Sequence, residues 1–489
     1  MRASGTKRTR AVPTTLSARL TGQVELETNA SGEIVASVEG YLENLGKFSA
    51  RAVERAQGLR SGLLLGSFER DGSDTDKEVH LLVRRLARRG LVEYRLGRTS
   101  KGDGDVVIEP QVPSYWPRTP SLASDDVLVL SRFAYMRQRA GRLVLESPRA
   151  GALFKICDPR IAATLAVLSA PQPIKRLRRR ADFPGLELLA LLVDSQILFK
   201  IDTADGKSLR AAEGDENLVV WDFHDLLFHT RSTEGRHANP VGGLYPHLGI
   251  TPPPAVRSPW PGEKLSLRRF STAATETASP AADLLRARRS VRDFDDERPI
   301  TLAELARFLD RTARIQSTWS SRLDLGGDGQ ADGPMLMYTV RPYPSGGSSY
   351  ELELYLAVDK CEGLERGFYH YDAGDHALAP IGARTAELDA MLNGAEFAMG
   401  APAPPQVLIT MAARFGRTSW KYSSIAYSLI LKDVGVLLQT FYLMATDMEL
   451  GGCAIGTTNI DLFAKMIGTE LHAEGPVGQF ALGRPRTQR

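Results

Sequence analysis

Two stretches in the middle of this chain cannot form regular secondary structure, and they set its organisation. The segments are "TPPPAVRSPWPG" (251–262) and "STAATETASPAA" (271–282). Proline removes backbone donors, and the small polar residues give no apolar periodicity, so neither segment packs as a helix or strand. We therefore place the main domain boundary here. With 489 residues, the chain is long enough for about three domains.

Charge and cysteine content exclude several classes of protein. The 61 basic and 58 acidic residues leave a net charge of +3, so no nucleic acid or anionic membrane is needed as a partner. Cys157, Cys361 and Cys453 lie far apart in the sequence, which gives neither a disulfide framework nor a zinc-binding CxxC pair. We expect a cytoplasmic protein.

The N-terminus shows no export signal. Residues 1–20, "MRASGTKRTRAVPTTLSARL", are basic but lack the apolar core of a secretory signal. No run of about eighteen apolar residues occurs in the chain. We expect residues 1–20 to form a disordered basic tail, and we expect no association with a membrane.

The front half contains a helix followed by a strand. In "DKEVHLLVRRLARRGLVEYRLGR", Gly90 ends the helix and an alternating strand comes next. The apolar positions at helical spacing are Val79, Leu82, Val83, Leu86 and Leu91. This is a winged-helix pattern, and we assign a first winged-helix-like module to residues 21–120.

A second segment repeats this order of parts without repeating the sequence. Hairpin-like "DDVLVLSRFAYMRQRAGRLVLESP" leads to helical "DPRIAATLAVLSAP" and then to "LELLALLVDSQILFKID", a helix with a strand after it. We assign a second winged-helix-like module to residues 121–215, and a junction and linker to residues 216–279.

Four arginines in the first helix admit three interpretations. Arg84, Arg85, Arg88 and Arg89 could contact DNA phosphates. They could instead form the solvated face of an amphipathic helix, which the low net charge favours. A third interpretation is that such a module grips a peptide along a strand edge through main-chain hydrogen bonds.

The histidines of the junction do not predict a metal site. In "WDFHDLLFHTRSTEGRH", His224 and His229 are five residues apart, so they do not share a helical face as an HExxH pair does. No cysteine or paired carboxylate completes a site. Because Trp221 and several other apolar residues flank them, we expect packed, hydrogen-bonded histidines and no metal.

The back half opens with a basic loop between two helices. In "ADLLRARRSVRDFDDERPITLAELARFLDRTARI", the second helix starts at Thr301 as N-cap, with Glu304 as its capping-box partner. The loop offers guanidinium groups and a hydroxyl, which together suit a phosphate monoester. These residues are Arg288, Arg289, Ser290 and Arg292. The alternative is a surface ion-pair network with the aspartates at 293, 295 and 296.

Several further motifs follow this loop in a fixed order. They are "RPYPSGGSSYELELYLAV", "GFYHYDAGDHALAPI", "WKYSSIAYSLILKDVGVLLQTFYLMATDMELGGCAIGTTNID" and "GQFALGRP". With "RRSVRDF", this order resembles the nitroreductase-like flavoproteins, and in particular the SagB/ThcOx type of azoline dehydrogenase that includes the cyanobactin oxidases. The paired modules and the "DFHDLLFH" junction are similar to the longer members of that type.

The resemblance implies an α+β fold and a cofactor. It implies a nitroreductase-like FMN domain over residues 280–489, with a central, mostly antiparallel sheet flanked by helices, after two winged-helix-like modules. FMN would lie at a homodimer interface. Its phosphate would bind the basic loop (Arg288, Arg289, Ser290 and Arg292), and Arg484 of "LGRP" would close the site.

Two glycine-containing segments would face the flavin ring in that family. The first is Pro344, Ser345, Gly346 and Gly347, commonly from the other protomer, whose bare main chain can approach a flat ring. The second is "GGCAIGTT", where the resemblance implies that the N–H groups of Ile455, Gly456 and Thr457 point at flavin N5. The alternative is that these glycines only end a helix and turn a corner.

Lys421 and Tyr422 match a Lys-Tyr pair of the azoline dehydrogenases. They lie at the mouth of a helix with a predicted buried stripe of Ile425, Leu429, Val436 and Phe441, so we expect both to project from its first turn toward a cofactor cleft. The resemblance implies that this pair accepts the ring Cα proton, with a lysine pKa lowered by burial or a tyrosinate supported by the lysine. The alternative is that Lys421 lies along the helix start and Tyr422 packs.

The sequence therefore predicts an FMN-dependent azoline dehydrogenase. It would oxidise thiazoline or oxazoline rings to thiazole or oxazole in a ribosomally made, modified peptide, with dioxygen as electron acceptor. The front modules would bind the leader part of that peptide or a partner cyclodehydratase. The alternatives are an NAD(P)H-dependent nitroreductase-like enzyme for a small molecule and a flavin-sensing DNA-binding regulator. No Walker, Rossmann or GxSxG motif competes.

Overall fold

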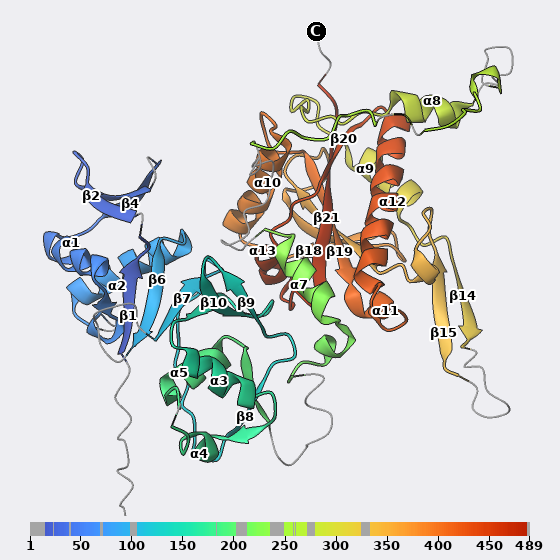
Figure 1. The fold of residues 1–489 in the computed structure, drawn as a ribbon. Coiled ribbons are helices and arrows are strands. Elements are labelled where there is room, and N and C mark those ends of the chain that lie inside the picture. Colours follow the sequence, from blue (N-terminus) through green and yellow to red (C-terminus); the bar gives the residue numbers. More distant parts are fainter. Residues whose placement is uncertain are drawn as a thin grey trace, which may run out of the picture. The chain divides into compact units, whose positions relative to one another are not determined.

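The chain forms two compact units, Met1–Pro240 and Val241–Arg489, coloured blue to green and green to red in Figure 1. The division falls within the predicted junction of residues 216–279. The computed structural model describes residues 15–22, 24–38, 41–68, 72–97, 105–181, 183–201, 213–234, 249–257, 259, 261–270, 279–323 and 333–486. Residues 1–14 of the predicted tail, residues 235–248 and residues 271–278 lie outside the described residues.

The first unit is built from three antiparallel sheets with short helices. Its elements are β1 (Thr15–Leu20), β2 (Val24–Thr28), β3 (Glu33–Val38), β4 (Tyr41–Lys47), α1 (Ala50–Ala56), η1 (Gln57–Arg60), β5 (Leu63–Leu64), η2 (Leu65–Ser67), α2 (Asp74–Arg88), β6 (Val92–Gly97), β7 (Val106–Pro110), β8 (Val127–Leu130), β9 (Tyr135–Arg139), β10 (Arg142–Glu146), β11 (Ala152–Ile156), α3 (Pro159–Val167), β12 (Gln172–Pro173), α4 (Ile174–Leu177), α5 (Leu186–Asp194), β13 (Leu198–Ile201), η3 (Glu216–Val220) and α7 (Phe223–Arg231). The sheet orders are β5-β1-β6-β7-β11-β10-β9, β12-β8-β13 and β2-β3-β4.

The predicted helices of this unit are confirmed where the apolar spacing was clear. Helix α2 starts with a Ser73–Asp76 capping box and buries Val79, Leu82, Val83 and Leu86. Gly90 follows with a φ of +70°, a conformation that costs glycine little and ends the helix. The β9–β10 hairpin, α3, and α5 followed by β13 also lie where the sequence predicted them. Whether either half of the unit is a winged helix stays a prediction.

One sheet crosses the predicted boundary between residues 120 and 121. Strand β7 pairs with β11 from Ala152↔Pro110 to Ile156↔Val106, and one apolar core runs through both halves of the unit. Residues 15–20, which we assigned to the tail, form β1 and bury Ala18 and Leu20 against β6. The basic composition hid this strand, and local patterns do not reveal which distant edges pair.

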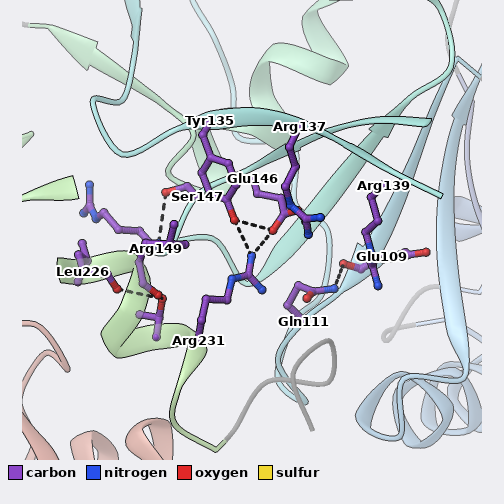
Figure 2. Close-up of polar contacts among 12 residues, drawn as sticks. Glu109, Gln111, Tyr135, Arg137, Arg139, Glu146, Ser147, Arg149, Leu226 and Arg231 are labelled. Atoms are coloured by element: carbon purple, nitrogen blue, oxygen red, sulfur yellow. Dashed lines mark hydrogen bonds and ion pairs between the residues drawn. The ribbon is translucent and has the colours of Figure 1, made fainter. Parts of the chain in front are cut away.

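A buried carboxylate joins helix α7 to the β9–β10 hairpin within this unit. Figure 2 shows Arg231 of α7 pointing at Glu146 and Tyr135. Tyr135 donates to Glu146 at 2.9 Å, and Arg137 lies 2.8 Å from the other oxygen of the same carboxylate. Because Glu146 is only 1% exposed, two cations and a hydroxyl are needed to compensate for its desolvation.

The second unit is a layered α+β domain. Its elements are η4 (Arg268–Phe270), α8 (Pro280–Ala287), α9 (Leu302–Thr312), β14 (Ser317–Arg322), β15 (Met335–Val340), η5 (Gly346–Ser348), β16 (Leu352–Val358), β17 (Gly367–Asp372), β18 (Ala377–Ile381), α10 (Thr385–Met399), β19 (Val407–Arg414), α11 (Phe415–Ser419), α12 (Ala426–Asp447), β20 (Gly451–Ile455), α13 (Ile460–Ile467) and β21 (Glu474–Gly483). Six strands form one sheet, β18-β17-β16-β19-β21-β20, and every pairing in it is antiparallel. Strands β14 and β15 form a separate hairpin.

Helices cover both faces of the six-stranded sheet, as predicted. Residues of α10 and α13 share one apolar core with alternate residues of β16, β19 and β21. On the other face, Phe441 of α12 lies 5.4 Å between ring centroids from Phe308 of α9 and 5.4 Å from Phe480 of β21. The predicted Thr301–Glu304 capping box is present at the start of α9.

Helix α12 lies along β21 and β20 (Figure 1). Among the described residues it is the one helix that is long and apolar enough to cross a membrane, with a mean hydropathy of 1.4. In this domain it is a packing helix, because it buries Ile430, Val434, Leu437 and Phe441. It also buries one acidic residue, Asp433.

Gln406 ties three segments of this domain together. Its Oε1 accepts from the backbone N–H groups of Ile300 and Arg484 at 2.9 Å each, and its Nε2 donates to the Asp295 carbonyl at 2.9 Å. The side chain is fully buried. We expect Gln406→Leu to lower the free energy of unfolding by about 2–4 kcal/mol, because it leaves the N–H groups of Ile300 and Arg484 without an acceptor.

Chemical denaturation of the purified protein measures this loss. Gln439→Leu, on the exposed side of α12, is the control and should change the free energy by less than about 0.5 kcal/mol. Equal effects of the two variants would contradict the role given to Gln406.

Candidate functional site

The basic loop after α8 lies against strand β20. The Val291 N–H donates to the Gly452 carbonyl at 2.9 Å. The Tyr442 hydroxyl of α12 accepts from the Ala454 N–H at 2.8 Å and lies 2.8 Å from Ser290 Oγ. Since one lone pair of that hydroxyl binds the N–H, its proton is available for Ser290. The loop and the "GGCAIGTT" segment are therefore held together by one tyrosine.

The arginines of this loop form a partly exposed cationic cluster. Arg288 and Ser290 are half-buried, whereas Arg289 and Arg292 are exposed. The Arg288 guanidinium lies 5.0 Å from the centroid of the Tyr442 ring, a cation–π contact that orients it. Burial raises the pKa of the Cys453 thiol in β20, and Arg292 beside it opposes that shift.

The predicted alternative of a local ion-pair network does not describe this loop. Its three aspartates pair with other cations: Asp293 with Arg486 at 3.1 Å, Asp295 with Arg298 at 2.8 Å, and Asp296 with Lys360 at 2.6 Å. Within the described part of the chain, no ion pair joins them to Arg288, Arg289 or Arg292. The loop's positive charge is therefore not neutralised by its own aspartates.

Arg484 is engaged elsewhere. Its Nη2 contacts both carboxylate oxygens of Glu304 at 2.7–2.8 Å, and its Nε donates to the Arg298 carbonyl at 3.0 Å. The carboxylate of Glu304 thus binds the Arg484 guanidinium, which we had assigned to the FMN phosphate. Glu304 was interpreted only as a helix cap, and nothing in its local pattern revealed this second partner.

The PSGG turn is held by a carboxylate from the middle of α12. Asp433 Oδ2 accepts from Ser345 Oγ at 2.8 Å and from the Gly346 N–H at 2.9 Å. Ser345 Oγ in turn accepts from the Tyr350 N–H at 3.0 Å. Pro344 and Gly347 remain exposed at the outside of the turn. The turn therefore presents bare main chain outward while its polar groups bind inward.

The Lys-Tyr pair meets this turn. Lys421 Nζ donates to the Gly347 carbonyl at 3.3 Å and lies 5.4 Å from the centroid of the Tyr422 ring. Gly347 has a φ of +61°, and an added Cβ would clash with the Tyr422 hydroxyl and lie 2.7 Å from Lys421 Nζ. A glycine is required here both for the backbone conformation and for the space.

Backbone strain concentrates in these two segments. Ser348 and Tyr350 after the turn, and Ser424 after the Lys-Tyr pair, all have φ between 44° and 61°. Such conformations cost non-glycine residues of order 1 kcal/mol or more and persist where the surroundings impose them. Their grouping around Gly347 is typical of a functional site.

Glu351 is a second buried carboxylate beside the turn. It is fully buried, and its Oε2 lies 3.4 Å from Ser345 Oγ. Burial, together with repulsion from Asp433, raises the pKa of Glu351 to about 7. Asp433, Glu351 and Tyr442 were not singled out from the sequence. An aspartate among the apolar residues of this helix was the one signal that could have identified Asp433.

The last predicted segment lies at the end of β20. Gly452 packs against the Phe480 ring and Gly451 against Val291, so both glycines serve close packing within β20, whereas the alternative interpretation had them end a helix and turn a corner. Ile455 is buried, whereas Gly456 is exposed with open space around it and Thr457 is half-buried. The backbone after β20 is thus accessible to a ligand.

Helix α12 positions both clusters. Tyr442 holds the basic loop and β20, and Asp433 holds the PSGG turn, nine residues earlier in the helix. At 1.5 Å per residue these two side chains start about 13 Å apart along the helix axis. The structure thus brings the predicted residues together as two groups, a cationic one and a glycine-containing one.

Two expectations about α12 were wrong. The helix begins at Ala426, so Lys421 and Tyr422 lie in the turn before it and not in its first turn. Ile425 is 50% exposed, and the buried stripe runs through Ile430, Val434 and Leu437 instead. Because this helix is apolar on most sides, the spacing alone fitted two stripes.

The expected burial of the lysine is also not found. Lys421 is exposed and Tyr422 half-buried in the single chain, so the desolvation on which the predicted lysine chemistry depended is not supplied by this chain alone. The exposed position of Lys421 is consistent with the alternative of a lysine that lies along a helix start. Its hydrogen bond to the Gly347 carbonyl is not part of that alternative.

The remaining candidates lie in the first unit. Arg84 lies 5.3 Å from the Trp116 ring centroid, Arg85 donates to the Leu45 carbonyl, and Arg89 pairs with Glu43 at 2.7 Å. These three arginines are therefore engaged within their own unit.

The junction histidines differ in their surroundings. His229 is buried and stacks on Trp221 at 5.8 Å between centroids, as expected. Exposed His224 lies 3.1 Å from Asp225 Oδ1, and ligand atoms of Asp222, His224 and Asp225 lie within 4.8 Å of one another. The sequence analysis missed this grouping, and nothing else there points to an ion.

Two family models match consecutive parts of the chain. Residues 285–484 match the nitroreductase family, and residues 128–238 match the cyanobactin oxidase ThcOx. Residues 285–484 contain the six-stranded sheet, α12 and both clusters, and residues 128–238 contain the Glu146 network. The second unit is therefore similar to the nitroreductase family over most of its length. A segment of the first unit is similar to the cyanobactin oxidases. The nitroreductase family generally uses flavin cofactors.

Similar proteins include nitroreductases and a chain of a microcin synthetase complex. A curated candidate nitroreductase of Methanocaldococcus jannaschii is 29% identical over 174 residues, which are 36% of this chain and 77% of that protein. A nitroreductase structure from Ralstonia eutropha JMP134 is 20% identical over 49% of this chain and 97% of that chain, with a TM-score of 0.32. A chain of the E. coli microcin synthetase McbBCD complex with truncated pro-MccB17 bound is 19% identical over 59% and 100%, with a TM-score of 0.36.

The packing at Gly347 gives a testable prediction. We expect Gly347→Ala to lower the free energy of unfolding by about 1–2 kcal/mol, because alanine resists a positive φ and its Cβ displaces Tyr422. Gly435→Ala, at a helix position of α12 with open space around it, should instead raise it by up to about 1 kcal/mol. Thermal denaturation of both variants measures the difference. A stabilising Gly347→Ala would contradict the described turn.

Proposed function

We propose that this protein is an FMN-dependent dehydrogenase that converts thiazoline or oxazoline rings of a ribosomally made peptide into thiazoles or oxazoles. The observation that carries the proposal is the hydrogen bond between Lys421 and Gly347, which brings the Lys-Tyr pair to the glycine turn. The match of residues 128–238 to the cyanobactin oxidase family supports a peptide substrate.

The residues of the two clusters fit FMN, with one exception. Arg288, Ser290 and Arg292 would hold the phosphate, with Arg289 at the edge of the same cluster, because cations and a hydroxyl converge there without a carboxylate. The exposed main chain at Gly347 would meet the flat ring. The backbone that follows buried Ile455, at Gly456 and Thr457, would face the ring edge. Arg484 does not fit, because Glu304 holds it.

In the proposed reaction, one azoline ring loses a proton and a hydride. FMN, when bound, supplies the two-electron acceptor for the hydride from the carbon next to Cα. Tyr422 Oη or Lys421 Nζ takes the Cα proton, and the Gly347 carbonyl keeps the lysine beside the tyrosine. Since both side chains lie at one turn, they form a base of fixed position. Dioxygen would finally take up the two electrons and protons.

The same proposal also specifies the partners of this protein. Lys421 is exposed in one chain, and a second copy in a homodimer would cover it and place the glycine turn against FMN held by its partner. The front unit would bind the leader part of the peptide or a cyclodehydratase. No nucleic acid or membrane takes part in this scheme, and the protein would work in the cytoplasm.

The base assignment is tested with purified protein and a thiazoline-containing peptide. Wild-type protein should remove about two hydrogen masses per ring. Lys421→Ala should slow this by about a hundredfold to ten-thousandfold. Lys432→Ala, exposed on α12, is the control and should keep the rate.

A second candidate function is distinguished by the same samples. The similarity to a candidate nitroreductase favours an NAD(P)H-dependent reductase of small molecules. Rapid bleaching of the flavin by NADPH without peptide, together with an unchanged peptide mass, would support this candidate and overturn the azoline proposal.

The phosphate assignment predicts a selective loss of affinity. Arg288→Ala should weaken FMN binding by about tenfold to a hundredfold, since a hydrogen bond to a charged group contributes about 1.5–3 kcal/mol. Riboflavin lacks the phosphate, so its affinity should stay unchanged. Arg286→Ala, which removes an arginine paired with Asp283 on α8, is the matched control. Isothermal titration measures all three, and an equal loss for riboflavin would contradict the assignment.

A further inference from the structure

Two buried carboxylates converge on one serine behind the glycine turn. Asp433 comes from the middle of α12, and Glu351 from the residue before β16. Ser345 Oγ lies 2.8 Å from Asp433 Oδ2 and 3.4 Å from Glu351 Oε2. Asp433 is 7% exposed and Glu351 0%. Burying two carboxylates so close together is costly unless one of them is neutral.

The hydrogen-bond directions show which carboxylate carries the proton. Asp433 Oδ2 accepts from both Ser345 Oγ and the Gly346 N–H, which suits an ionised carboxylate. Ser345 has a single hydroxyl proton, which goes to the shorter contact with Asp433, while its lone pairs face the Tyr350 N–H and Glu351. A neutral Glu351 can donate to Ser345, whereas an ionised one would face a lone pair. One proton on Glu351 therefore satisfies all the contacts of Ser345.

We propose that Glu351 and Asp433 are positioning residues that hold the PSGG turn through this single proton, and that removing the proton loosens the turn and weakens cofactor binding. The proposal deepens the function proposed above and rests on it for the role of the turn. Neither residue touches the reacting atoms; both act through Ser345 and Gly346.

The surroundings of Glu351 support this assignment. The groups that face it are Asp433 of α12, the Thr418 hydroxyl of α11 and the Tyr343 hydroxyl ahead of the turn. Burial raises the pKa of Tyr343, so this neighbour stays neutral. Burial and Asp433 raise the pKa of Glu351 from its ordinary value to about 7, although hydrogen bonds from its own N–H and from Thr418 act in the opposite direction. The folded protein therefore keeps the proton below about pH 7 and loses it above.

The test measures the turn itself as well as the cofactor. In the flavin-free protein, amide hydrogen exchange of residues 344–351, corrected for intrinsic rates, should speed up about tenfold between about pH 6 and about pH 8.5. FMN affinity should fall by a similar factor over the same range. Glu351→Gln, which is neutral at every pH and keeps a donor for Ser345, should remove both changes. Asp433→Ala should give fast exchange at both pH values.

Controls and outcomes separate the two proposals. Glu353→Gln is the control. It removes a carboxylate of β16 that pairs with His370, and it should leave the pH step in place. A pH step that persists in Glu351→Gln, or is missing in wild-type protein, overturns the inference, even if Asp433→Ala does not fold. Absence of FMN binding together with the expected exchange step would overturn the proposed function and leave the role of the carboxylates in the turn supported.

Discussion

The hydrogen bonds that α12 makes from its buried face organise the candidate site. A long apolar helix packs easily against a sheet, but two of its polar side chains reach different segments. Asp433 binds the glycine turn and Tyr442 binds the basic loop and β20. Because the helix is rigid and packed on both α9 and β21, it fixes where each segment lies. Removing either side chain would leave the sheet intact and detach part of the site.

Glycine serves different purposes at its different positions in this domain. At Gly451 and Gly452 it permits tight packing against Val291 and Phe480, and at Gly347 it permits a positive φ beside Tyr422. Only the last position leaves main chain exposed next to a candidate base. The structure therefore separates the glycines that build the fold, Gly451 and Gly452, from Gly347, which shapes the site.

The sequence revealed the parts of the fold and site that depend on local patterns. The α2 stripe, the Thr301–Glu304 cap and the loop around Arg288 follow from spacing and residue type. Contacts between segments far apart in the sequence could not be predicted from these local patterns. The β7–β11 pairing merged two predicted modules, Glu304 captured Arg484, and Glu351 came to lie beside Asp433. Each of these depends on chain topology, which periodicity does not encode. The orientation of α12 was misread because its apolar residues surround it.

The central claim is that the two clusters on α12 are the two halves of one FMN site completed by a second copy of the chain. A crystal structure of the protein grown with FMN tests it most directly. The account predicts the phosphate on Arg288, Ser290 and Arg292 of one protomer, and the ring against Gly346 and Gly347. A ring bound away from this turn, or a phosphate held by other residues, would contradict it.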